Sequence, residues 1–222
     1  MKFEELKTLY DLPLFDLIKK SRKVHDANWA DNEIQLCTLL SIKTGGCSED
    51  CSYCAQSARY KSGVESEKLM EKEDVMARAR VAAASGSTRF CMGAAWKGVR
   101  SGTKRFDQVV EIIEDVSELG MEVCVTLGEV GADEAVRLKK AGVTAYNHNL
   151  DTSREHYPNV VTSHSYDDRL QTIKNVQDAG MAVCCGGILG LGETADDRLK
   201  MIETISELNP QPESVPINSL MP

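Results

Sequence analysis

The chain lacks the features that mark membrane, secreted and nucleic-acid-binding proteins. No run of about 18 apolar residues occurs, so no membrane-spanning helix is expected. The start, residues 1–6, is too acidic and polar for a secretory signal and lacks the arginine and serine bias of a transit peptide. Lys and Arg number 26 against 34 Asp and Glu, a net charge of −8, which argues against a nucleic-acid partner. The expected location is the cytoplasm.

Metal-binding histidine patterns are also absent, while cysteine is plentiful. The four histidines show no metal-binding spacing and are expected at the surface or in loops. The eight cysteines are expected to be metal or catalytic ligands, because thiols stay reduced in the cytoplasm.

Three of these cysteines, Cys47, Cys51 and Cys54, lie within eight residues. Cysteine thiolates hold iron–sulfur clusters, and three ligands on a [4Fe–4S] cluster leave one iron open for substrate or water, as catalytic metal sites require. A helix with its cysteines turned to the core is disfavoured by Gly45 and Gly46 just before the motif. Zinc is disfavoured because no second CxxC pair exists.

A repeated unit of amphipathic helix, glycine and short apolar strand begins near residue 73. Helices are predicted at 73–85, 107–119, 132–141, 166–179 and 194–208. Glycines follow the first four, as left-handed helix ends prefer: Gly86, Gly120, Gly142 and Gly180. Strands are predicted at 34–41, 89–92, 122–127, 145–150, 182–189 and 214–218.

Strict β/α alternation predicts an α/β fold with a parallel sheet covered by helices. No strand is followed by a GxGxxG turn, which leaves a (β/α) barrel of the TIM type as the favoured class. Residues 1–30 are predicted as an N-terminal helical extension and 31–222 as the barrel domain. About six β/α units are predicted before the chain ends, so an incomplete barrel, most simply a fragment, is expected.

Strand alternation sorts several other cysteines. Cys91 shares a face with Arg89, and Cys124 opposes Val123 and Val125, which should face the helices. Cys184 and Cys185 are neighbours that cannot both point inward, and periodicity does not choose between them. Inward cysteines from three strands could form a second iron–sulfur site, although a buried small hydrophobe is the alternative for each. Cys37 is expected in the core.

Two further segments could contact a ligand. Residues 147–151 place two amides and a carboxylate on one face where a strand ends, suited to ribose hydroxyls or a urea-like group or simply to a turn. The glycine-rich passage 186–193 would allow close approach of a ligand to the backbone, and Ile188 or Leu191 could pack on a purine. Glycines also simply make turns.

Together, residues 41–60, 87–96, 146–153, 186–194 and 213–218 resemble the biotin synthase family of radical S-adenosylmethionine enzymes, in family order. The resemblance implies sulfur insertion into dethiobiotin to form biotin, the last step of biotin biosynthesis, begun by reductive cleavage of S-adenosylmethionine. It also implies a flavodoxin- or ferredoxin-type reductant and a homodimer.

The resemblance implies a role for each matching residue. Cys47, Cys51 and Cys54 would hold the [4Fe–4S] cluster, and Cys91, Cys124 and Cys184 a [2Fe–2S] cluster. Asn149 and Asp151 would bridge the cofactor ribose and dethiobiotin, and Asn218 would contact the dethiobiotin ring. The cofactor S-adenosylmethionine would lie along Tyr53, Ala94 and Ala95, with Ile188 near its adenine.

One departure from the family concerns the [2Fe–2S] cluster, whose fourth ligand in the family is an arginine that no arginine here matches. Weak or absent biotin formation by the 222-residue chain is therefore expected. Lipoyl-type sulfur insertion is disfavoured because residues 1–36 contain no cysteine. A passive iron–sulfur carrier is the alternative outside enzymes.

Overall fold

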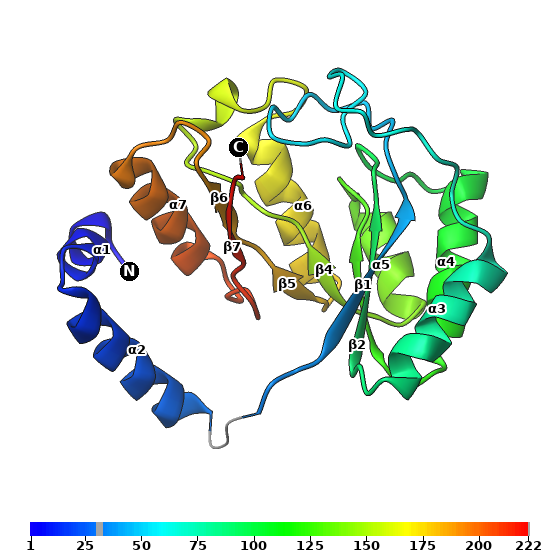
Figure 1. Ribbon diagram of the computed structural model, residues 1–222, viewed down its shortest axis with the longest axis horizontal. Coiled ribbons are helices and arrows are strands. Elements are labelled where there is room, and N and C mark those ends of the chain that lie inside the picture. The colour runs from blue at the N-terminus through cyan, green and yellow to red at the C-terminus, as the bar shows by residue number, and fades with distance from the viewer. Residues whose placement is uncertain (30–32, 222) are drawn as a thin grey trace.

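Five parallel strands in sequence order form the main sheet of the computed structural model, which describes residues 1–29 and 33–221 (Figure 1). They are β1 (Cys37–Lys43), β2 (Arg89–Ala94), β3 (Glu122–Thr126), β4 (Val143–Asn147) and β5 (Ala182–Cys184). The register sets Cys91 beside Cys124 and Asn147 beside Cys184. Parallel pairing of consecutive strands requires a crossover between each pair, which helices supply here.

A second parallel sheet, of two strands, lies beside the β5 end of the main sheet. It pairs β6 (Gly187–Leu189) with β7 (Ile217–Ser219). Isolated bridges join the two sheets, Asp151 to Gly187 and Cys184 to Ser214. The strand predicted at 182–189 is therefore interrupted at Cys185 and Gly186, and its two halves belong to different sheets.

Helices pack on the outer side of the strands (Figure 1). They are α3 (Lys72–Ala84), α4 (Lys104–Ser117), α5 (Ala132–Lys140), α6 (Tyr166–Asp178) and α7 (Ala195–Glu207). The apolar period predicted for the second of them is confirmed, since Val109, Ile112, Ile113 and Val116 of α4 are at most 1% exposed. They contact the fully buried outer faces of the neighbouring strands, such as Val123 and Val125. The predicted alternating α/β architecture is thus confirmed.

Two N-terminal helices precede the sheet, α1 (Phe3–Tyr10) and α2 (Leu14–Asn28). α1 lies against α7, where the Phe3 amide donates to Glu203 Oε1 (2.9 Å) and Lys2 pairs with Glu207 (2.6 Å). The predicted boundary between the helical extension and the barrel falls at residues 30 and 31, outside the described residues. In the described part of the chain, no helix combines the length and the apolar character that crossing a bilayer requires.

Candidate functional site

A cavity of about 640 Å³ lies along the concave face of the main sheet and extends to the carboxyl ends of its strands. The loop that follows β1, residues 44–71, runs over this end of the sheet (Figure 1). Carboxyl ends of parallel strands are the usual position of ligand sites in α/β proteins. Nearly all the residues singled out in the sequence line this cavity: Cys47, Cys51, Tyr53, Cys54, Cys91, Ala94, Ala95, Cys124, Asn149, Asp151 and Cys184.

The three-cysteine loop, residues 44–58, is shaped by its own backbone. The Cys47 amide donates to Gln56 O (2.9 Å), and the Ala58 amide donates to Cys47 O (2.8 Å). Gly45 has a φ of 66°, and a Cβ there would lie 2.3 Å from Glu65 O, so only glycine fits. Burial raises the pKa of Cys51 to about 12. The loop therefore presents three thiols to the cavity, two of them buried.

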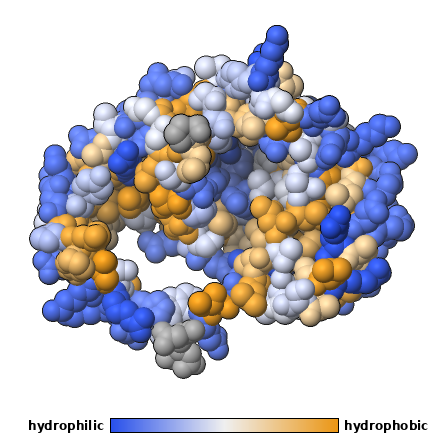
Figure 2. Space-filling view, viewed as in Figure 1, coloured by the Kyte–Doolittle hydropathy of each residue, from blue (hydrophilic) through white to orange (hydrophobic). Residues whose placement is uncertain are grey.

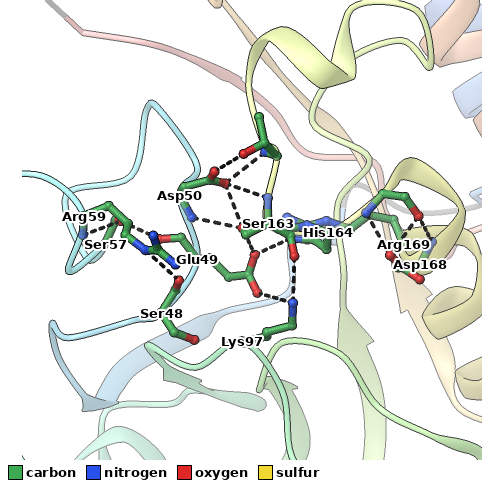
Figure 3. Close-up of polar contacts among 12 residues, drawn as sticks. Ser48, Glu49, Asp50, Ser57, Arg59, Lys97, Ser163, His164, Asp168 and Arg169 are labelled. Atoms are coloured by element: carbon green, nitrogen blue, oxygen red, sulfur yellow. Dashed lines mark hydrogen bonds and ion pairs between the residues drawn. The ribbon is translucent and has the colours of Figure 1, made fainter.

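A second loop, residues 159–165, clamps the three-cysteine loop (Figure 3). The Asp50 carboxylate accepts from the amides of Thr162 (2.9 Å) and Ser163 (3.0 Å). In return, the Asp50 amide donates to Ser163 Oγ (3.1 Å), and the Ser52 amide donates to Val160 O (3.0 Å). The hydrogen bonds from Thr162 and Ser163 hold the pKa of Asp50 below its ordinary value. Contacts between residues about 110 apart in sequence thus fix the loop that carries the cysteines.

A buried series of polar contacts also joins Glu49 and Tyr53 of the three-cysteine loop. Glu49 pairs with His164, whose Nε2 lies 2.7 Å from the Tyr157 hydroxyl. That hydroxyl accepts from Arg169 Nε (2.9 Å), and Arg169 Nη2 reaches Asp151 Oδ2 (3.2 Å). The same Asp151 oxygen accepts from the Tyr53 hydroxyl (2.9 Å). Each buried group in this series therefore has a polar or charged partner, as burial demands.

Asp151 and His148 are the most deeply buried titratable groups of the cavity wall. Burial raises the pKa of Asp151, and the Arg169 charge opposes this rise. Burial also lowers the pKa of His148 well below its ordinary value, so its imidazole is neutral. His148 Nε2 is buried and has no hydrogen-bond partner among the described residues, an exception to the usual pairing of buried polar atoms.

Cysteines from three strands of the main sheet, β2, β3 and β5, also line the cavity. The thiol of Cys91 interacts with that of Cys124, and this contact together with the Arg89 charge lowers the pKa of Cys91. Cys184 lines the same cavity, whereas Cys185 is fully buried in the core. Arg89 is held by Glu122 (Nε to Oε2, 2.7 Å) and Glu213 (Nη2 to Oε1, 2.8 Å). Of the two neighbouring cysteines that periodicity could not separate, Cys184 is the one on the cavity side.

Both cysteine sets have the donor chemistry of iron–sulfur sites. All six thiols are free of disulfides and line one cavity, and thiolate sulfur is the ligand that such clusters require. Among the described residues, the one group with ligand atoms within 4.8 Å of one another is Glu49, Glu129 and His164. Lys97 already places its ammonium 3.2 Å from Glu49 Oε1 there.

Two predicted contact residues lie outside the cavity lining. Ile188 of β6 and Asn218 of β7 are paired neighbours, and Asn218 is exposed. Asn149 does line the cavity, and its carboxamide oxygen accepts from the Gly186 amide (3.1 Å). This bond leaves the Asn149 amide N–H groups as the donors that it can offer to a ligand.

The expectation for Cys37 was wrong. It is exposed and lines the cavity, because β1 is an edge strand whose cavity face has little cover. His148 and His164 lie in loops, within the expectation of surface or loop positions, but their side chains are buried beside the site. Sequence reasoning missed Arg169 as well as Glu49 and Ser163, and the partners of the last two lie more than 110 residues away.

A parallel β/α half-barrel with a three-cysteine loop after its first strand defines the class of radical S-adenosylmethionine proteins. Residues 41–205 match the family model described as Radical SAM superfamily. The structure superimposes on methylornithine synthase (PylB) with a TM-score of 0.83 at 18% identity, over all of this chain and 65% of that one. HydG, a maturase of the [FeFe]-hydrogenase, gives 0.82 at 21%, over all of this chain and 51% of that one. These likenesses show the fold.

Proteins of similar sequence identify the family within this class. Biotin synthase from Myxococcus xanthus is 55% identical over 98% of this chain and 62% of its own length. The mitochondrial biotin synthase of Arabidopsis thaliana is 55% identical over 98% of this chain and 58% of its own length. That of Francisella tularensis is 50% identical over the whole chain and 70% of its own length. The chain belongs to the biotin synthase family, and its cofactors are a [4Fe–4S] cluster, S-adenosylmethionine and a [2Fe–2S] cluster.

The chain spans about three fifths of the length of the first two relatives that it matches, 62% and 58%.

Proposed function

We propose that the chain acts as a biotin synthase, inserting sulfur into dethiobiotin by S-adenosylmethionine-dependent radical chemistry. One observation carries the proposal: two separate cysteine sets, one on a loop and one on three strands, line a single cavity. A cluster for starting the reaction and a cluster for donating sulfur both need thiolate ligands. Their convergence on one cavity would let a single substrate reach both.

Cys47, Cys51 and Cys54 would hold the [4Fe–4S] cluster. When bound, that cluster supplies an open iron site and the electron for reductive cleavage of S-adenosylmethionine. The protein's contribution is to fix the three thiols, which the contacts of Asp50 and Ser52 with residues 160–163 achieve. Preorganised ligands spare the reaction the cost of ordering them.

Tyr53, Asn149 and Asp151 would orient the organic part of the cofactor and the substrate. Asp151 Oδ2 is engaged by Tyr53 and Arg169, so its second oxygen is the acceptor available for a hydroxyl or urea N–H group. Ala94 ends β2 and Ala95 follows it, and these two small residues would lie along the cofactor. Ile188 and Asn218 would complete the site from β6 and β7.

The [2Fe–2S] cluster would be held by Cys91, Cys124 and Cys184, which line the cavity from β2, β3 and β5. Arg89, paired with Glu122 and Glu213, lines this part of the cavity and would help to limit the access of water. Exclusion of water protects reactive intermediates from side reactions. Asn218, which would contact the dethiobiotin ring, is exposed on β7, so this part of the substrate site is open. We therefore expect the isolated chain to cleave S-adenosylmethionine more readily than it forms biotin.

The partners would be dethiobiotin, a flavodoxin- or ferredoxin-type electron donor and a second copy of the chain. The cytoplasm is the location that fits eight cysteines without a disulfide. Analytical ultracentrifugation tests the dimer, and cell fractionation tests the location.

The decisive experiment is anaerobic reconstitution with iron and sulfide, followed by reduction with dithionite and addition of S-adenosylmethionine. We expect 5′-deoxyadenosine and methionine from the wild-type chain, and a loss of at least about 100-fold in Cys54→Ala, because a cluster ligand is removed. Cys185→Ala is the matched control, since this thiol is buried away from the cavity. A passive carrier would bind iron and sulfide yet leave S-adenosylmethionine intact, and that result would refute the proposal.

A further inference from the structure

Lys43, the last residue of β1, places a buried positive charge in the wall of the cavity. It lines the cavity together with Cys47 and is 9% exposed. Its ammonium donates to the carbonyl oxygens of Gly45 and Ala95, the latter at 3.1 Å. A lysine ammonium has three N–H donors, so one donor is left without a partner among the described residues.

This charge is not offset by a carboxylate. In the part of the chain that the structure describes, no acidic group pairs with Lys43, whereas Lys97, Lys174 and Lys200 each pair with one. Burial of a charge without a counter-charge is costly. The ammonium therefore needs an anionic partner other than the carboxylates of the protein.

The ammonium lies against the start of the three-cysteine motif. Gly45 O is one of its acceptors, and a Cβ on Gly46 would lie 3.5 Å from Lys43 Nζ. Cys47 is the next residue. Burial lowers the pKa of Lys43 and raises that of Cys47, and the interaction between the two charges opposes both shifts. Lys43 and Cys47 thus act on each other electrostatically.

We propose that Lys43 is the counter-charge of the outer cluster, the [4Fe–4S] cluster of Cys47, Cys51 and Cys54, and that it raises the reduction potential of this cluster. The inference rests on the proposed function for the identity of the cluster. Three thiolates make the site anionic, and reduction adds one electron from the external donor while Lys43 keeps its proton. A fixed positive charge in a wall of low dielectric stabilises the reduced cluster more than the oxidised one.

The test measures the potential of the reconstituted cluster in the full chain, without S-adenosylmethionine. Each protein is poised under argon at a series of potentials with a europium(II) chelate, and EPR at low temperature records the reduced [4Fe–4S] cluster. At a fixed potential, we expect the ratio of reduced to oxidised cluster to fall at least about tenfold in Lys43→Gln and Lys43→Met, a shift of about 59 mV for one electron. Lys43→Arg keeps the charge and should keep the ratio within about threefold.

These substitutions separate the charge from the hydrogen bonds. Glutamine keeps an N–H donor for Gly45 or Ala95, whereas methionine keeps only the buried stem, and an apolar side chain in place of a buried charge is often tolerated. Lys61→Gln is the matched control, because it removes the same charge from an exposed position on the same loop. Water and salt screen that charge, so the ratio should change by less than about twofold. Circular dichroism and iron content check folding and cluster loading.

A shift in Lys43→Met but not in Lys43→Gln would overturn the proposal, because the hydrogen bonds would then be responsible. Loss of the cluster from both neutral variants would also overturn it, since the role of Lys43 would then be structural. An unchanged potential with weaker binding of S-adenosylmethionine, measured by equilibrium dialysis, would assign the ammonium to the carboxylate of that cofactor instead.

The proposed function fails in a different way. A chain that shows the shift in potential yet leaves S-adenosylmethionine intact would refute the proposed function and keep the role of Lys43. A wild-type chain that binds no [4Fe–4S] cluster would refute both.

Discussion

Asp151 combines an unusual backbone with a buried charge. Its φ is 66°, in the left-handed region that few residues other than glycine occupy, and its side chain is 2% exposed. The backbone is held on both sides, since its amide donates to Gly186 O (3.1 Å) and its carbonyl accepts from Ile188 N (2.8 Å). Conformations of this kind persist where surrounding contacts enforce them, often at functional sites.

Arg169 is the residue whose removal should harm this arrangement most. In Arg169→Met, Asp151 loses its buried counter-charge, and we expect the free energy of unfolding to fall by about 3–5 kcal/mol. Urea denaturation of the apoprotein measures this. Lys174→Met, which removes an exposed pair with Asp178 from the same helix, should cost less than about 1 kcal/mol. Equal losses in the two variants would contradict the structural role given to Arg169.

Strand alternation was sufficient to place individual cysteines on a face, but not to find their partners. Cys91 and Cys124 face the cavity because residues two apart share a face and their apolar neighbours need burial. Cys37 could not be placed this way, because its exposure depends on β1 being an edge strand. His164 could not either, since its partner Glu49 is 115 residues away.

At the level of elements, the break between β5 and β6 depends on Gly186. A Cβ on this residue would lie 1.8 Å from Pro216 O, so a backbone segment would have to move. We expect Gly186→Ala to lower the free energy of unfolding by about 1–3 kcal/mol, as overpacking does. Gly93→Ala is the matched control, because no atom lies within 4 Å of its added Cβ. A thermal melt that ranks the two variants in the opposite order would refute this.

The start of α7 gives a prediction for pH. Asp197 accepts from the Ser153 hydroxyl (2.6 Å) and from the Thr194 hydroxyl (2.6 Å), and these bonds lower its pKa to about 2. A depressed pKa stabilises the fold above the unfolded value of about 3.9, and the contribution is lost as pH falls to about 2.

Asp197→Asn should therefore be less stable than wild type at pH 7 by roughly 1 kcal/mol, and the difference should shrink between about pH 4 and pH 2. Chemical denaturation across this range measures it. Asp196→Asn removes the same charge from the same turn and serves as control. A difference that is constant with pH would mean that the carboxylate is not responsible.

Helix positions were predicted closely because their signals are local. The apolar period lies within each helix, and the four glycines that follow helices lie within a few residues of the helix ends. The division of the strand predicted at 182–189 into β5 and β6 was not predicted. It depends on the bridges of Gly187 to Asp151 and of Cys184 to Ser214, which the local sequence does not reveal.

Across the whole molecule, α2 is the element with the least tertiary support. None of its side chains is buried, and Leu14, Phe15 and Ile18 are more than half exposed. Figure 2 shows an opening between the two N-terminal helices and the rest of the molecule, with apolar surface beside the segment that leads into β1. Few buried contacts imply a low free energy of local opening.

Limited digestion with trypsin should therefore cut first within α2, at Lys19, Lys20, Arg22 or Lys23. Sites in α4, such as Lys104 and Arg105, should survive longer, because that helix packs on the sheet through six buried residues. Mass spectrometry of the early fragments identifies the first cut. Earlier cleavage in α4 would show that α2 is better supported than its contacts indicate.

The contacts that shape the three-cysteine loop are bonds between protein groups, from Asp50 to residues 162–163 and along the series of polar contacts from Glu49 to Tyr53. The proposed receptacle for the outer cluster is thus shaped by the polypeptide itself. A molecule that has lost this cluster to oxygen should therefore keep the loop in place and take up fresh iron and sulfide without refolding.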